Sequence, residues 1–233
     1  LASAKRNRDW WQARAAQLPR APQLPFAHQP RELTPPVIGR LASHMKADAW
    51  QSLKSHAARG GVTAAGMFAA ILGETLSRFS RSPHMTLNLT LFDRAVERAA
   101  YEGVLGDFTS MLPVTVRAGA GQTFLALCRA AHEDICQALS HADISGAEVN
   151  AIIARAHATP NENPLPVVLT CATGIAGGSY LDAASRFGEL IFACNQAPQT
   201  WIDAQVVEYR DGLSLVWDYP QGLFPPDLVE SMF

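Results

Sequence analysis

The segment 84–92, HMTLNLTLF, alternates between apolar and polar side chains and gives the clearest strand in the sequence. Successive side chains of a strand point to opposite faces, so the leucines share one face and Asn88 lies on the other with the threonines. The leucine face predicts a buried core. The opposite face carries Asn88 with Thr86 and Thr90.

Hydrophobic patterning predicts the remaining elements in the same way. Strands are expected at 37–45, 111–118, 165–170, 189–195, 200–209 and 212–219, with a hairpin turn at the RDG that joins the last two. Helices are expected at 5–18, 46–61, 63–80, 122–140 and 146–157, with another beginning in 226–233. Thr63 is a suitable N-cap, and Gly60 and Gly61 a helix stop. This order predicts an α/β fold, a two-layer sandwich of a mixed sheet packed by helices.

A proline-rich stretch, LPRAPQLPFAHQP, occupies residues 18–30. Proline fixes φ and lacks an amide donor, so this stretch is expected to be extended and semi-rigid. We therefore divide the chain into 1–30, a helix and linker, and 31–233, a single lobe.

Composition narrows the class of protein. The chain has 233 residues, 48% of them hydrophobic, and a net charge of −2, which gives no reason to expect nucleic acid or a membrane as partner. No apolar run is long enough for a transmembrane helix, and residues 1–17 lack the apolar core of a signal peptide. The four cysteines form no C-x-x-C pair and are expected to be reduced thiols in a cytoplasmic protein, with Cys128 and Cys136 packed in a helix core. The histidines lack zinc-site spacing.

Several stretches occur in the order of a known set of motifs. They are LPRAPQLPF (18–26), LNLTLFDR (87–94), LGDFTSML (105–112), SHADISGAEV (140–149), PVVLTCATG (166–174), NQAPQTWIDAQVVE (195–208) and LVWDYPQGLFPP (215–226). Together they resemble the heterocyclization domains of nonribosomal peptide synthetases, a branch of the condensation-domain family. GDFTS and TLFDR favour this cyclizing branch over ordinary amide-forming condensation domains.

The resemblance implies a chloramphenicol-acetyltransferase-like fold and identifies the chain with the C-terminal lobe of a two-lobed domain that encloses a tunnel. The family's D-x-x-x-x-D motif, which belongs to the N-terminal lobe, is absent from this sequence. The implied activity joins a carrier-bound acyl group to carrier-bound cysteine, serine or threonine and closes a thiazoline or oxazoline. The implied partners are the N-terminal lobe, carrier domains bearing phosphopantetheine and an adenylation domain. No metal or directly bound cofactor is expected.

An aspartate interrupts the apolar strand at 200–209. Alternation places Asp203 on one face with Trp201 and Gln205. Asp203 is either an exposed or salt-bridged carboxylate, or an acid in a pocket. An unperturbed aspartate has a pKa of about 3.9, and burial beside Trp201 would raise that pKa towards values useful for proton transfer. The resemblance assigns Asp203 and Thr170 to cyclodehydration.

Supporting roles are expected for other polar residues, namely Gln205, Asn88, Asp93 and Asp107. Asn88 either lines the tunnel that the resemblance implies or faces solvent, and for Asp107 a structural role in capping or orienting a loop is favoured. The sequence departs from the family pattern at Asp93, Cys171, Ala197 and Ala204, where the family has asparagine, serine, threonine and histidine respectively. These departures leave open a second reading, a divergent lobe that serves as a scaffold or docking platform within a synthetase.

Overall fold

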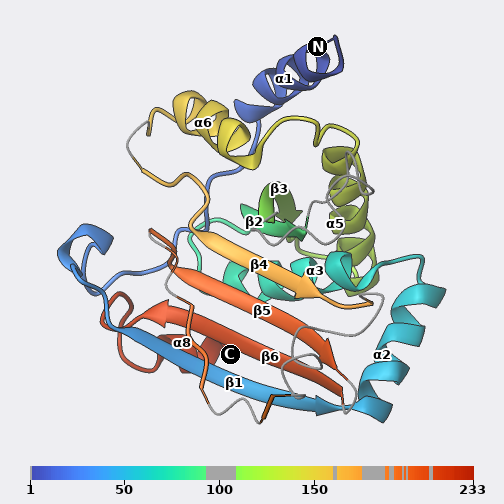
Figure 1. Ribbon diagram of the computed structural model, residues 1–233, viewed down its shortest axis with the longest axis vertical. Coiled ribbons are helices and arrows are strands. Elements are labelled where there is room, and N and C mark those ends of the chain that lie inside the picture. Colours follow the sequence, from blue (N-terminus) through green and yellow to red (C-terminus); the bar gives the residue numbers. More distant parts are fainter. Residues whose placement is uncertain are drawn as a thin grey trace.

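The computed structural model describes residues 2–92, 109–159, 162–174, 187–188, 192–195, 197, 199–209 and 212–233. Its centre is a six-stranded mixed sheet in the order β1-β6-β5-β4-β2-β3 (Figure 1). The strands are β1 (Ile38–Lys46), β2 (His84–Phe92), β3 (Thr109–Arg117), β4 (Val167–Ala172), β5 (Ile202–Tyr209) and β6 (Gly212–Pro220). β4 runs parallel to both β2 and β5, and the other pairs are antiparallel. The predicted mixed α/β fold is confirmed.

Helix α3 (Ala64–Ser77) lies behind the sheet in Figure 1 and packs on one of its faces, and α5 (Phe124–Leu139) packs on α3 and β3. The other helices are α2 (Ala47–Arg59) at the end of β1, α6 (Gly146–Ala156) near the edge strand β3, and the short α8 (Leu228–Met232). The Thr63 hydroxyl accepts a hydrogen bond from the Gly66 amide, so the predicted N-cap of α3 is confirmed. α3 lies tightly on the sheet, because a Cβ on Gly73 would stand only 2.4 Å from Val116 Cγ1. The core lies between these helices and the sheet.

Both faces of β2 are buried. Met85, Leu87 and Leu89 belong to the core beneath the helices, as the alternation predicts. On the opposite face Thr86 and Asn88 are also buried, and the Thr86 hydroxyl donates to the Pro19 carbonyl at 2.7 Å. The solvent-facing alternative for Asn88 is therefore wrong.

The first helix, α1 (Ala2–Ala15), packs against α6 and is anchored by Trp11, whose indole donates to the His141 carbonyl at 3.0 Å. An extended stretch follows, as the prolines predict, and leads to a short 3-10 turn, η1 (Pro30–Glu32). The division between 1–30 and 31–233 stays a prediction.

Two sequence expectations are wrong. The expected strand at 189–195 is absent from its described part, since residues 192–195 are in no strand. They lie beside the polar side chains of β5 and β6, where Asn195 hydrogen-bonds to side chains and forms no ladder. Cys136 is exposed, whereas Cys128 is buried at the edge of the apolar stripe that includes Leu127, Ala131 and Ile135, because eight residues turn the helix by about 80° beyond two full turns and carry Cys136 outside that stripe. All four cysteines are free thiols.

Among the described residues no helix has the length and apolar character needed to cross a bilayer.

Candidate functional site

A row of register-matched residues crosses the sheet on the face opposite α3. Asp203 on β5 pairs with Asp218 on β6, and Asp218 pairs in turn with Arg40 on β1. On the other side Asp203 is matched with Val168 on β4, which is matched with Asn88 on β2. Register-matched side chains project from the same face of a sheet. Five strands therefore bring residues that are far apart in sequence into one line.

Asp203 is a buried carboxyl, with 4% of its surface exposed. Its Oδ2 accepts hydrogen bonds from the Asn195 side-chain amide and from Gln205 Nε2, the latter at 3.3 Å. Its Oδ1 is buried and has no hydrogen-bond partner in the described part of the chain. Burial raises the pKa of Asp203 above its ordinary value, and the Asp218 charge raises it further, outweighing the two amide donors. The expectation of an exposed carboxylate is wrong.

Asp218 has a contrasting environment, although it is equally buried. Arg40 donates two hydrogen bonds to the Asp218 carboxylate, from Nε at 2.7 Å and from a terminal nitrogen at 2.6 Å. The Asn195 backbone amide donates to it at 3.0 Å, and Gln205 Nε2 donates at 3.2 Å. Gln205 thus bridges the two carboxyl groups, which confirms it as a neighbour of Asp203.

Sequence reasoning missed Asp218, Arg40 and Asn195. The hairpin offered a signal for the first, because Tyr209 and Gly212 close it and counting back along both strands brings Asp203 opposite Asp218. No comparable local signal pointed to Arg40, which lies on a strand remote in sequence.

Thr170 lies in the next row of the same face, matched with Gln205 across β4 and β5. Its hydroxyl oxygen is 2.9 Å from that of Thr90 on β2, another residue that the sequence analysis missed. Thr170 is half-buried, so its hydroxyl lies nearer the surface than the Asp203 carboxyl. The structure therefore brings Thr170 and Asp203 to the same patch through Gln205.

Of the remaining predicted residues, the structure describes Asn88 but not Asp93 or Asp107. Asn88 is buried, and its Oδ1 lacks a hydrogen-bond partner within the described ranges. Asp93 and Asp107 lie outside the described residues.

The departure from the family pattern at Ala204 falls on the core side of β5, where Ala204 is matched with Trp217, so it removes no group from the Asp203 face. The departure at Cys171 also lies off that face, because Cys171 follows Thr170 on its strand.

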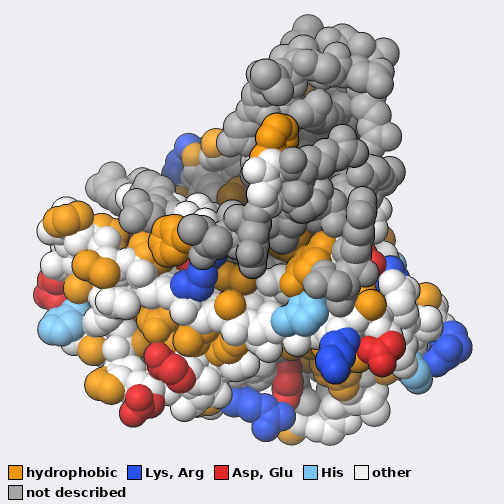
Figure 2. Space-filling view, turned by 60° about the horizontal axis from the view of Figure 1, so that its bottom comes forward, with side chains coloured by type: hydrophobic (Ala, Val, Ile, Leu, Met, Phe, Trp, Pro, Cys, Tyr) orange, Lys and Arg blue, Asp and Glu red, His pale blue; other side chains and the backbone are white. Residues whose placement is uncertain are grey.

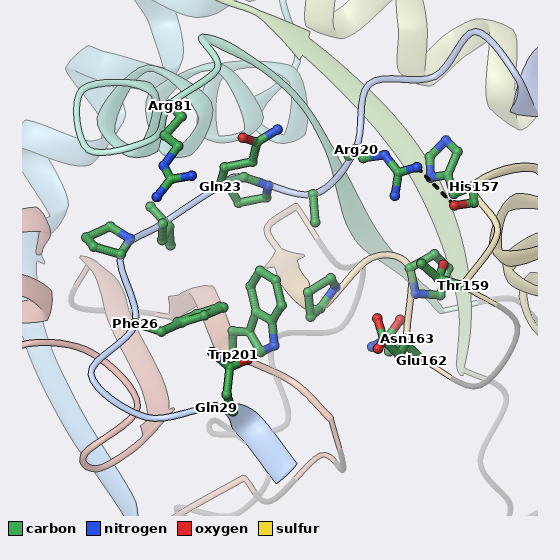
Figure 3. A pocket seen from close by; sticks show the side chains of 16 residues that line it. Arg20, Gln23, Phe26, Gln29, Arg81, His157, Thr159, Glu162, Asn163 and Trp201 are labelled. Atoms are coloured by element: carbon green, nitrogen blue, oxygen red, sulfur yellow. Dashed lines mark hydrogen bonds between the residues drawn. The ribbon is translucent and has the colours of Figure 1, made fainter. Parts of the chain in front are cut away.

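A groove of about 600 Å³ lies at the start of β5, between the proline-rich stretch and residues 159–166 (Figure 3). Trp201 stands at its centre beside Phe26, and Arg81 reaches in from the other wall. Arg20 is committed to the His157 carbonyl at 2.9 Å. The groove includes neither Asp203 nor Thr170, so this groove and the candidate chemistry are separate features.

Charges on the molecule are interspersed. On the side shown in Figure 2, described basic and acidic side chains alternate and do not gather into one patch. No cluster of histidine, cysteine and acidic residues that could hold a metal ion occurs among the residues searched, which are the described ones.

The fold and the site define a class. A condensation-domain family model matches residues 2–171, and the chain belongs to that family. It is 35% identical to pyochelin synthetase PchE of Pseudomonas aeruginosa over 99% of this chain, and 32% identical to phenyloxazoline synthase MbtB of a Mycobacterium species over 97%.

A solved structure supports the same family assignment. The cyclization-docking bidomain of the synthetase EpoB from Sorangium cellulosum superposes on the whole of this chain with a TM-score of 0.90 and 32% identity. The resemblance to heterocyclization domains is therefore confirmed. The chain spans 47% of the EpoB bidomain, 16% of PchE and 19% of MbtB.

Proposed function

We propose that this chain is the C-terminal lobe of a heterocyclization domain and supplies the acid for ring closure. The observation that carries the proposal is the state of Asp203, a buried carboxyl with a raised pKa and one oxygen without a partner among the described residues. A carboxyl whose pKa is raised keeps its proton to higher pH than an ordinary aspartate, and this makes it the better proton donor. The amide donors occupy Oδ2, so the proton belongs on Oδ1.

The dehydration that completes the ring needs two proton transfers. Before it, the thiol or hydroxyl of the accepting residue adds to the carbonyl carbon of the new amide, its proton passes to the carbonyl oxygen, and a cyclic intermediate forms that bears a hydroxyl and an N–H. Asp203 donates its proton to this hydroxyl, the carbon–oxygen bond breaks, and water leaves. The nitrogen lone pair forms the C=N bond, the N–H proton passes to the Asp203 carboxylate, and the acid is restored. One positioned carboxyl serves both transfers.

Thr170 has a supporting task in this scheme. Its hydroxyl is held by Thr90 at 2.9 Å and lies in the row next to Asp203. A hydroxyl both donates and accepts, so Thr170 can orient the intermediate and carry its proton towards the carboxyl.

The substrates would arrive on partners. The domain would be completed by its N-terminal lobe, and carrier domains would present the donor and the cysteine, serine or threonine on phosphopantetheine. An adjacent adenylation domain would load the acceptor. The site would thus operate in a cytoplasmic multidomain synthetase and would need no bound metal or diffusible cofactor.

The test replaces Asp203 by asparagine in the complete domain with both carriers loaded. Asparagine keeps the shape of the side chain but cannot act as the acid, so ring formation should fall by about 10²- to 10⁴-fold while amide formation continues. The linear product on the downstream carrier, one water heavier than the ring, is measured by mass spectrometry. Thr170→Val tests the hydroxyl, and Thr170→Ser, which keeps it, is the matched control.

The outcomes separate the possibilities. If the two residues act as a unit, the double variant should be little slower than the slower single variant. Heterocycle formed by Asp203→Asn at the parent rate would contradict the proposal. Loss of both bond formation and ring closure in a folded variant would point to a tunnel-shaping role. If the unaltered complete domain forms neither product, the scaffold reading is favoured.

A further inference from the structure

We infer that Arg40 and Asp218 form a positioning pair that decides which of the two facing carboxyl groups keeps the proton, leaving it on Asp203. The inference rests on the proposed function, because it explains how Asp203 would be kept in its acid form. Neither residue need touch the substrate, and both would act through Asp203.

The first argument is the proximity of two acidic groups. Asp203 and Asp218 are directly opposed on antiparallel strands, a position in which Cβ atoms lie about 4.5–5.5 Å apart. Both side chains are buried, at 4% and 3% exposure. Two like charges so close in a buried setting repel strongly, so one of the two groups is driven to keep a proton.

The second argument is the asymmetry of their partners. Asp218 accepts a bidentate pair of charge-assisted hydrogen bonds from Arg40, a geometry that favours an ionised carboxylate. Within the described ranges, Asp203 receives only neutral amide donors, and those on a single oxygen. The arginine therefore assigns the negative charge to Asp218 and the proton to Asp203.

The third argument is that the two carboxyl groups share their donors. Gln205 Nε2 reaches one oxygen of each, at 3.3 Å and 3.2 Å. Asn195 does the same with different atoms, giving its side-chain amide to Asp203 and its backbone amide to Asp218. A change in the charge or position of Asp218 should therefore alter the hydrogen bonds that Asp203 accepts from Gln205 and Asn195.

The charged groups that face Asp203 act in opposite directions. From β6 the Asp218 carboxylate favours the protonated form of Asp203, and from β1 the Arg40 guanidinium favours the ionised form. From β4 the facing residues are Val168 and Thr170, which carry no charge. Asn195, which contacts Asp203 from the segment before β5, is also uncharged. Removing either charge should therefore move the titration of Asp203 in a known direction.

The experiment measures ring closure against pH in the complete domain under single-turnover conditions. Protonated Asp203 is the active form, so the rate falls as pH rises past its pKa. Asp218→Asn removes the neighbouring negative charge and should move this descending limb to lower pH, with about tenfold loss of rate on the limb for each pH unit. Arg40→Gln should move the limb to higher pH, because a positive charge that favours ionised Asp203 is lost, and should also lower the plateau rate, because Asp218 then holds the proton for part of the time. Amide formation by both variants reports that they are folded.

Two controls sharpen the test. Glu74→Gln also removes one negative charge, but from the exposed Arg78–Glu74 pair on α3, and should leave the limb in place. In the Asp218→Asn background, Arg40→Gln should still raise the limb, because the positive charge of Arg40 itself favours ionised Asp203, but it should no longer lower the plateau rate, because no second carboxyl remains to take the proton. A carbon-13 NMR titration of the Asp203 carboxyl, assigned by its absence in Asp203→Asn, follows the same shifts without depending on turnover and also serves any variant too slow to assay.

The possible results are distinguishable. Opposite shifts in the two variants support the inference, both in the rate profile and in the NMR titration. If Asp203→Asn abolishes ring closure but neither variant shifts the titration of Asp203, the positioning role is wrong and the proposed function stands. If Asp203→Asn still forms the ring while the NMR shifts occur as expected, the electrostatic pairing is right and the proposed function is wrong.

Discussion

Asp203 and Asp218 face each other directly across two antiparallel strands, and the bidentate ion pair of Arg40 is made with Asp218. The same sheet position therefore holds two carboxyl groups with different environments. One is tied to a permanent positive charge, and the other has a buried oxygen without a partner among the described residues. Such a difference in environment allows one carboxyl group of a shared site to act as an acid while the other stays ionised.

The raised pKa of Asp203 predicts a pH-dependent cost in stability. The folded state holds the Asp203 proton more tightly than the unfolded chain does, so the stabilising contribution is complete below the unfolded pKa of about 3.9 and is lost as pH rises through the folded pKa. Asp203→Asn has no such dependence. The free energy of unfolding of the variant, measured in urea and relative to the parent, should therefore increase from acidic to mildly alkaline pH. A constant difference would contradict a raised pKa.

The close approach of α3 to the sheet predicts a severe effect at one glycine. Gly73→Ala would place a methyl group 2.4 Å from Val116 Cγ1, and the buried strand has to move. The free energy of unfolding should fall by about 1–3 kcal/mol as judged by urea denaturation, despite the preference of helices for alanine. Gly119→Ala is the control, because its nearest contact is 3.8 Å away and its effect should stay within about 0.5 kcal/mol. Equal effects would show that the packing is looser.

The cysteines should differ in reactivity. Cys136 and Cys194 are exposed, whereas burial raises the pKa of Cys128 and brings that of Cys171 to about 11. At pH 8 only about one Cys171 in a thousand is a thiolate, the reactive form. Iodoacetamide should therefore label the exposed pair first, with the other two labelled after unfolding, as peptide mass mapping would show. Labelling of Cys171 at the rate of Cys136 would contradict this.

The proposed division of labour between lobes predicts that residues 1–233 alone form no heterocycle. Ring closure requires two carrier-bound substrates to be aligned, and alignment supplies much of the rate of such reactions. The isolated chain, incubated with both loaded carriers, should yield no product above background, and addition of the separately produced N-terminal lobe should restore some. Turnover by the isolated chain would show that this lobe contains a complete site.

Local patterns sufficed for much of the fold because they reflect local physics. The alternation in 84–92 identified β2 and its core face, and Thr63 and Gly60 marked helix ends through groups that the backbone needs there. The family motifs added Asp203, Thr170 and Gln205, which the structure does bring to one patch. The expected strand at 189–195 failed over its described residues, because alternation shows only that a segment can pair, and its neighbours decide whether it does.

The sequence by itself determined most of the elements, the core face of β2 and the family. Only the tertiary structure decided that Arg40 on β1 reaches Asp218, that Thr90 meets Thr170, and that the face bearing Asn88 is buried. The physical reason is distance along the chain. A strand pattern specifies which side chains share a face, but the partners of that face come from other strands and loops, and their order in the sheet is fixed by the packing of the whole domain.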